Sequence, residues 1–159
     1  MKIHLIAIGS KMPKWVEQGY KEYAGRLPRE CSLELHELPL ANRGKDSAKA
    51  DIPRAMDNEA NRILARVPSG ARIVALDERG KPWSTRELSG QMDNWMMDGR
   101  DVALLIGGPD GLSPSLRAKA DQLWSLSNLV LPHPLVRIVV AEQLYRAMSI
   151  IRSHPYHRD

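Results

Sequence analysis

Residues 131–153 read LPHPLVRIVVAEQLYRAMSIIRS, and this stretch decides how the rest of the chain is interpreted. Prolines are tolerated in the first turn of a helix, so Pro132 and Pro134 predict a helix entrance with His133 between them. Apolar side chains then surround most of the predicted helix, which reaches Ile151. Such a helix must be buried on more than one side, in a core or against a partner subunit. The tail HPYHRD follows directly, so we expect the active site near this end of the chain.

Length and composition limit the classes of protein. The 159 residues, 43% of them hydrophobic, predict a single domain spanning residues 1–159. The apolar runs fall short of the roughly 20 residues that cross a bilayer, and the start shows no cleavage signature, so we expect a cytoplasmic protein without a membrane partner. The single cysteine, Cys31, excludes an internal disulfide and offers no metal-binding cluster. A pI near 9.4 suits an anionic partner but does not require nucleic acid.

Strand and helix patterns alternate along the chain. Apolar residues at every second position, or in a continuous run, predict strands, and apolar residues at helical spacing predict helices. Ser84 and Glu87 form a capping box that predicts the start of a helix. We expect a flexible basic loop over 40–51 and a turn over 78–83. The predicted strands are 3–8, 33–38, 71–77, 101–108 and 123–127, and the predicted helices are 12–27, 53–66, 84–99, 116–122 and 135–151. This order indicates an α/β fold with a mostly parallel sheet.

Ligands of parallel sheets bind beyond the carboxyl ends of the strands. The strongest candidate there is the glycine turn, GGPDG at 107–111, where Gly107 and Gly108 would let a ligand approach the backbone. The spacing matches neither a dinucleotide fingerprint nor a phosphate loop. Two interpretations stay open, a ligand-binding loop and a tight strand-to-helix turn.

A second candidate site combines His133 with the C-terminal tail. His154, Tyr156, His157 and Arg158 are residue types that titrate near neutrality or contact phosphates and bases. The alternative is a frayed polar terminus, the common fate of a chain's last residues.

Several motifs together resemble the RlmH family of SPOUT-class methyltransferases. They are KMPKWVEQGYKEYAGRLP, RGK at 43–45, LDERGKPW, LLIGGPDGLSP, LSNLVLPHPLVRIVVAEQLYRA and the terminal HPYHR, which follow the family order from end to end. The resemblance implies a mostly parallel sheet with helices on both faces and a C-terminal deep trefoil knot, assembled as a homodimer. It also implies S-adenosylmethionine bound between three loops, at Leu76, at Gly107 and Gly108, and at Leu126, Ser127, Asn128, Leu129, Val130 and Leu131.

The family reaction is methyl transfer to N3 of a pseudouridine in a hairpin of 23S ribosomal RNA within the ribosome. By resemblance, His133 is a possible base, while Tyr156, His157 and Arg158 seat the target base and its phosphates; no metal is implied. A helix N-terminus disfavours imidazolium, which would keep His133 neutral. Candidate RNA contacts are Arg137, Arg146, His154, Lys11, Arg43 and Lys45. For the two helical arginines the alternative is a structural pair with Glu142.

Two other classes of function stay open on the residues alone. A cofactor-binding sensor without catalysis would keep the glycine turn but would not need the tail. A ribosome-associated binding protein would use the basic surface alone. Binding of S-adenosylmethionine separates these classes, because neither phosphate-specific nor purely basic recognition predicts it.

Overall fold

A parallel sheet organises the molecule, a computed structural model that describes residues 1–43 and 51–158. Within these residues five strands pair in the order β2-β1-β4-β3-β5, and every pairing is parallel. The predicted α/β class with a parallel sheet is therefore confirmed. No helix of the described chain is long and apolar enough to cross a membrane.

The elements follow the predicted order with shifted ends. The strands are β1 Lys2–Ile8, β2 Ser32–Leu38, β3 Arg72–Pro82, β4 Val102–Ile106 and β5 Gln122–Ser125. The helices are α1 Lys14–Ala24, α2 Asp51–Arg66, α3 Thr85–Asp98, α4 Pro114–Lys119 and α5 His133–Ile151, with short 3-10 helices η1 Arg29–Cys31 and η2 Pro155–His157. The predicted capping box is present, because Ser84 Oγ accepts from the Glu87 N–H and the Glu87 carboxylate accepts from the Ser84 N–H.

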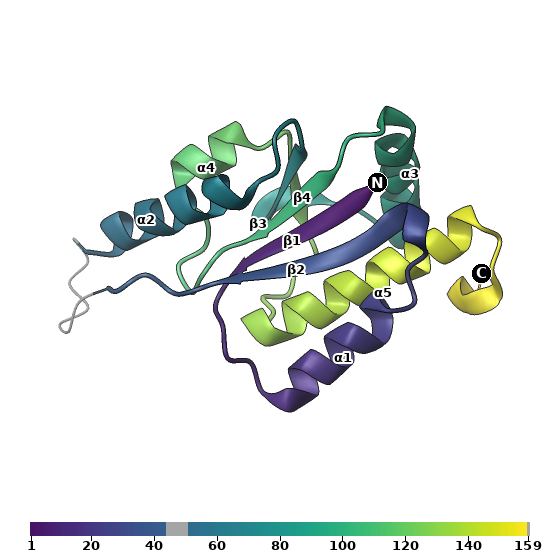
Figure 1. Cartoon of the computed structure of the whole chain (residues 1–159), viewed down its shortest axis with the longest axis horizontal. Coiled ribbons are helices and arrows are strands. Elements are labelled where there is room, and N and C mark those ends of the chain that lie inside the picture. Colours follow the sequence, from purple (N-terminus) through teal and green to yellow (C-terminus); the bar gives the residue numbers. More distant parts are fainter. Residues whose placement is uncertain (44–50, 159) are drawn as a thin grey trace.

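Helices cover both faces of the sheet, as expected (Figure 1). One face packs under α2 and α4, with a core that includes Ile6, Ile63 and Leu116. The other packs under α1, α3 and α5, with a core that includes Leu5, Trp95 and Leu144. Alternate residues of β1 point to the two cores, which is why its run IHLIAI is apolar at every position except His4.

Helix α5 lies against α1 and α3 and buries an arginine among its apolar residues. Leu144 is fully buried inside the chain's own core, so it does not belong to a surface free for a partner. Leu129, Val130 and Leu135, around the start of α5, are instead exposed. If a second copy covers this helix, it does so near the start.

The turn predicted over 78–83 is wrong in part. β3 leaves its register with β5 after Leu76 and pairs again at Lys81 and Pro82, so only a short excursion separates two halves of one strand. A Cβ at Gly80 would lie 2.5 Å from the backbone nitrogen of Trp124. The glycine therefore allows the chain to return close to β5.

Candidate active site

A wide cleft of about 1530 Å³ opens beyond the carboxyl ends of β3, β4 and β5. All nine residues expected to hold a cofactor line it: Leu76, Gly107, Gly108, Leu126, Ser127, Asn128, Leu129, Val130 and Leu131. His133 lines it too, at the first residue of α5. Sequence reasoning therefore placed residues from three separate loops around one cavity, at the edge where parallel sheets bind ligands.

The glycine turn closes one wall of the cleft. Gly111 N donates to Gly108 O at 2.9 Å, with Pro109 and Asp110 at the turn's centre. Proline in the second position and glycine in the fourth suit a type I turn, and Gly111 has a φ of +81°. Ser113 then caps α4 by accepting from the Leu116 N–H at 3.2 Å.

Protein contacts crowd both glycines of this turn. A Cβ at Gly107 would lie 2.5 Å from the carbonyl carbon of Gly111, inside the turn itself. At Gly108 it would meet Glu59, Ile8 and Leu40 at 3.2 Å. The tight turn explains Gly107, and crowding by neighbouring side chains favours a glycine at 108. The glycines themselves therefore do not prove a ligand-binding role, but their place in the cleft lining supports one.

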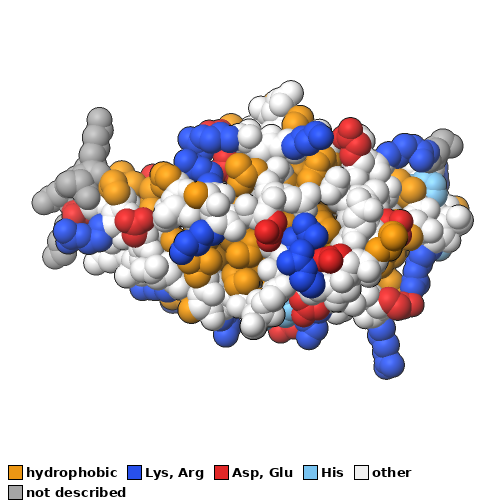
Figure 2. Space-filling model, turned by 90° about the horizontal axis from the view of Figure 1, so that it is seen from above, with side chains coloured by type: hydrophobic (Ala, Val, Ile, Leu, Met, Phe, Trp, Pro, Cys, Tyr) orange, Lys and Arg blue, Asp and Glu red, His pale blue; other side chains and the backbone are white. Residues whose placement is uncertain are grey.

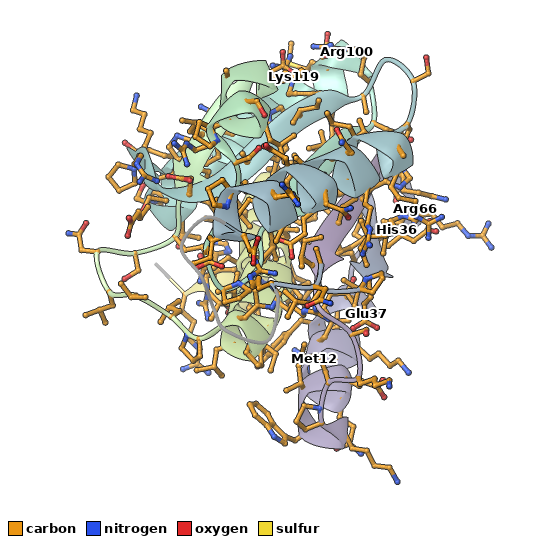
Figure 3. The ribbon with its side chains drawn as sticks, turned by 90° about the vertical axis from the view of Figure 1, so that its left-hand side faces the viewer. Met12, His36, Glu37, Arg66, Arg100 and Lys119 are labelled. Carbon is orange, nitrogen blue, oxygen red and sulfur yellow. The ribbon has the colours of Figure 1, made fainter. Side chains whose placement is uncertain are left out.

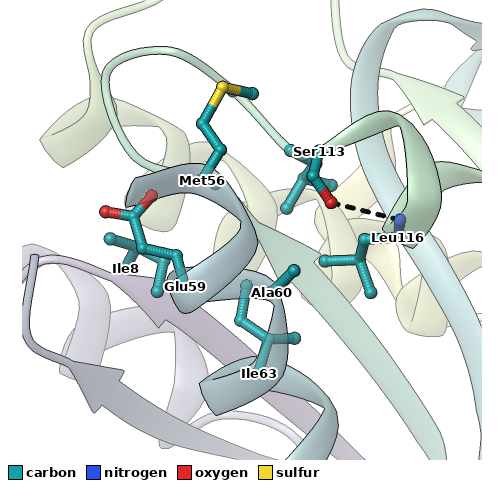
Figure 4. Close-up of a pocket in the computed structure, with 10 residues that line it drawn as sticks. Ile8, Met56, Glu59, Ala60, Ile63, Ser113 and Leu116 are labelled. Carbon is teal, nitrogen blue, oxygen red and sulfur yellow. Dashed lines mark hydrogen bonds between the residues drawn. The ribbon is translucent and has the colours of Figure 1, made fainter. Parts of the chain in front are cut away.

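Helix α2 packs directly behind this turn (Figure 4). Ile8, Met56, Ala60, Ile63 and Leu116 fill the junction, which has no volume even for a water molecule. The glycine turn therefore rests on a packed base.

The buried carboxylate of Glu59 ties the glycine turn to the segment after β2. It accepts from the Ala41 N–H at 3.0 Å and from Arg43 Nη1 at 2.7 Å, while Arg43 Nε donates to Asp110 at 2.7 Å. Glu59 is only 2% exposed, and hydrogen bonding to it raises the pKa of Arg43. Arg43 thus holds the turn, and its engagement with two carboxylates argues against the phosphate contact expected from sequence.

His133 joins the final helix to the glycine turn. Its Nε2 lies 2.7 Å from the carbonyl oxygen of Gly107. A carbonyl can only accept, so Nε2 carries the proton and Nδ1 keeps its lone pair. Burial, and then the charge of Arg137, lowers the pKa of His133. The imidazole is therefore neutral near pH 7 and able to accept a proton at Nδ1.

Arg137 lies one helical turn beyond His133 and is 1% exposed. Its Nη1 donates to Glu37 at 2.6 Å and its Nη2 donates to Gly9 O at 2.8 Å. The guanidinium therefore connects α5 to the ends of β1 and β2. This burial argues against the expected RNA contact, and the partner is Glu37 instead of the Glu142 considered in the alternative.

The C-terminal tail packs on the far end of α5. The Tyr156 hydroxyl donates to Glu142 at 3.0 Å, its ring lies 4.5 Å from that of Tyr145, and Arg146 lies over it. The tail as far as Arg158 is therefore folded, which overturns the alternative of a frayed terminus. Arg146 also donates to Glu142 at 2.9 Å, so the structural pair considered for Arg146 is present.

The structure does not bring the tail and the cleft together within one chain. His133 begins α5 and the tail follows its end, and 19 residues of helix span about 28 Å. Of the tail residues, His154 and Arg158 are exposed and His157 is half-buried. A site that uses both regions requires two chains.

Comparison with known proteins settles the family. A family model described as "Predicted SPOUT methyltransferase" matches residues 1–157. A protein named Ribosomal RNA large subunit methyltransferase H, from Thioalkalivibrio sulfidiphilus (strain HL-EbGR7), is 55% identical over 159 residues, covering all of both chains. The protein of the same name from Marinomonas sp. (strain MWYL1) is 53% identical over 158 residues, covering 99% of this chain and all of that one. The chain belongs to the RlmH family of SPOUT methyltransferases.

Solved structures agree with a SPOUT fold. A probable methylase family protein from Haemophilus influenzae Rd KW20 covers 99% of this chain and 70% of its own, with a TM-score of 0.56 and 12% identity. A probable methyltransferase from Bordetella pertussis Tohama I covers 92% and 95%, with a TM-score of 0.54 and 18% identity. At these identities the likeness concerns the fold alone.

Among the residues that the structure describes, the face that carries α2 and α4 shows no continuous basic surface (Figure 2). Lysine and arginine side chains there are interspersed with acidic ones. Among the remaining candidate RNA contacts, Lys11 is exposed in the loop after β1, with a φ of +58°, and Lys45 lies outside the described residues.

Sequence reasoning missed two residues that build this site. Glu59 anchors the glycine turn and Glu37 holds Arg137. Both lie inside predicted elements, where no local signal marks them. Asp77 ends the strand predicted over 71–77, at the edge expected to bind a ligand, and it lines the cleft with its side chain 5% exposed.

Proposed function

We propose that this protein transfers a methyl group from S-adenosylmethionine to N3 of a pseudouridine in a 23S ribosomal RNA hairpin, on the assembled ribosome in the cytoplasm. The observation that carries the proposal is the convergence of three loops and His133 on one cleft, in a chain of this methyltransferase family. The full-length relatives named as ribosomal RNA large subunit methyltransferases supply the substrate class. We infer the trefoil knot from the same family membership.

The cleft lining suits the proposed methyl donor. Apolar side chains of Leu76, Ile106 and Val136 lie there together with the backbone of the glycine turn and of residues 126–131. Adenine needs such an apolar slot with backbone groups at its edge, and the volume is ample for the whole cofactor. When bound, S-adenosylmethionine supplies an electrophilic methyl group on its sulfonium.

His133 fits the role of proton acceptor in this reaction. N3 must lose its proton before its lone pair can attack, and a neutral imidazole with a free Nδ1 can receive that proton. The carbonyl of Gly107 fixes the tautomer, and Arg137 opposes protonation in the resting enzyme. Arg137 is accordingly a positioning residue that acts through His133.

The tail completes the site by acting across a homodimer. Leu129, Val130 and Leu135 are exposed apolar side chains beside the cleft, which supports a contact there with a second copy. An antiparallel arrangement of the two α5 helices would carry Tyr156, His157 and Arg158 of one chain to the cleft of the other. There the tyrosine can stack on the target base, while Arg158, His154 and Lys11 are available to RNA phosphates.

The deciding experiment is methyl transfer to ribosomes from a strain lacking the relevant methyltransferase. Purified protein and labelled S-adenosylmethionine are added, and the modified nucleotide is mapped by mass spectrometry. We expect one methyl group on a pseudouridine of 23S RNA, and none with protein lacking residues 156–159. Binding of the cofactor without any transfer to ribosomes, subunits or free RNA would support the sensor alternative instead.

A further inference from the structure

Two histidines and a glutamate meet at the amino edge of the sheet, the edge opposite the cleft. His4 lies on β1, and Glu34 and His36 lie on β2, where His4 is directly opposite Glu34 and diagonal to His36. Alternation along the strands turns all three side chains to the face that carries α2. One ligand atom from each lies within 4.8 Å of the others.

The spacing of the two imidazoles suits a shared metal ion. His4 Nδ1 lies 3.1 Å from His36 Nε2, and the nearer Glu34 oxygen lies 3.7 Å from the same His36 nitrogen. Two imidazole nitrogens bound to tetrahedral zinc at about 2.05 Å lie roughly 3.3 Å apart. The pair is therefore already close to the separation that zinc imposes.

Asp101 prepares His4 for this role. Its Oδ2 lies 3.1 Å from His4 Nε2, and burial leaves His4 8% exposed. A carboxylate on one imidazole nitrogen places the proton there and leaves the lone pair on the other nitrogen, the arrangement found behind metal-binding histidines. Here that other nitrogen is Nδ1, which faces His36.

We propose that His4, His36 and Glu34 bind a divalent transition-metal ion, with Zn²⁺ the best match, and that Asp101 orients His4 behind it. Imidazole donors select zinc and its neighbours over magnesium, and one carboxylate completes three protein ligands with a position left for water. The site lies far from the cleft and clasps β1 to β2. By joining the two strands the ion would stabilise the sheet, and the proposal stands independently of the proposed methyl transfer.

Two cations oppose the ion and make the site tunable. Lys2 Nζ lies 3.0 Å from Glu34 and competes for its carboxylate. Arg66, at the end of α2, adds positive charge near His36, and Figure 3 shows the side chains of Arg66 and His36 on the same side of the molecule. Removing the charge of Lys2 should therefore strengthen metal binding, a result that a simple hydrogen-bonded histidine pair does not predict.

Zinc binding to untagged, chelator-stripped protein tests the proposal. We expect one Zn²⁺ per chain in competition with a chromophoric chelator, and tetrahedral visible bands with Co²⁺. Zinc at a hundredfold excess over its Kd should raise Tm by roughly 5–10 °C. Mg²⁺ should give neither effect.

Matched variants locate the ion. His36→Gln and Asp101→Asn should each weaken zinc binding roughly tenfold or more, and Lys2→Gln should tighten it. His154→Gln, which removes an exposed histidine of the tail, should leave it unchanged. The proposal is overturned if the wild-type protein binds no zinc, or if His36→Gln binds zinc as tightly as the wild type does. If His36→Gln fails to fold, an undiminished zinc affinity in Asp101→Asn overturns it instead.

Discussion

The ion pair between Arg137 and Glu37 offers the sharpest test of how the start of α5 is held. Replacing Arg137 by methionine preserves much of the side chain's volume but removes donors to Glu37 and to the carbonyl of Gly9. The hydrogen bond to the Gly9 carbonyl is part-buried, and leaving such an acceptor without its donor costs about 1–3 kcal/mol. The Glu37 side chain is 32% exposed and recovers some hydration, so losing its ion pair with Arg137 adds only about 1 kcal/mol. We expect Arg137→Met to destabilise the fold by about 2–4 kcal/mol.

Urea unfolding with linear extrapolation measures this change, and a double-mutant cycle with Glu37→Gln isolates the pair. Arg100→Met, which removes an exposed arginine paired with Asp98, is the matched control and should move the midpoint far less. NMR titration adds a second readout, since the pKa of His133 should rise once the neighbouring charge is gone. A stability loss below about 0.5 kcal/mol, within the range of ordinary surface substitutions, would refute the reasoning.

Three further predictions concern the tail, the dimer and pH. Deleting residues 156–159 removes the Tyr156–Glu142 hydrogen bond and ring contacts, which together are worth about 1–2 kcal/mol. Calorimetry should therefore show a Tm lower by several degrees, and methyl transfer should be lost. Full activity of the truncated protein would return the tail to a structural role. Leu135→Asp places a charge on the exposed apolar start of α5 and should give a folded monomer by sedimentation, whereas an unchanged dimer would exclude this surface. The pKa of His133 is lower in the folded protein than in the unfolded chain, so the unfolded chain binds more protons as pH falls below about 6.5. The free energy of unfolding should therefore decline below that pH, and it should decline less in His133→Gln. An equal decline in the wild-type protein and in His133→Gln would contradict the assignment.

Local signals in the sequence predicted most elements because each depends on near neighbours. The capping box at Ser84 and the prolines around His133 mark helix starts that the structure reproduces. The turn predicted over 78–83 was expected to end the strand at Asp77, because its residues favour turning. The sequence could not show that β3 regains its pairing with Trp124, since that depends on a strand more than 40 residues away.

Long-range pairs set the limit for the site as well. Arg137 and Glu37 are 100 residues apart, and the Arg43–Glu59–Asp110 cluster joins three segments. Nothing in local spacing pairs such groups, so Arg137 and Arg43 were expected at RNA and lie instead in structural bonds. The cleft's place was predicted because the carboxyl ends of parallel strands share one edge, and the family resemblance then supplied its individual cofactor residues. His4 and His36 escaped notice because only strand register brings them together.

Calorimetric titration with S-adenosylmethionine tests the central claim that the cleft beside His133 holds the methyl donor. We predict saturable binding by the wild-type protein and its loss in Gly107→Val, whose Cβ would meet the turn's own backbone at 2.5 Å and displace the carbonyl that His133 contacts. A melting curve for the variant confirms that it is folded. Absence of binding to the wild-type protein, or undiminished affinity in folded Gly107→Val, would contradict the account.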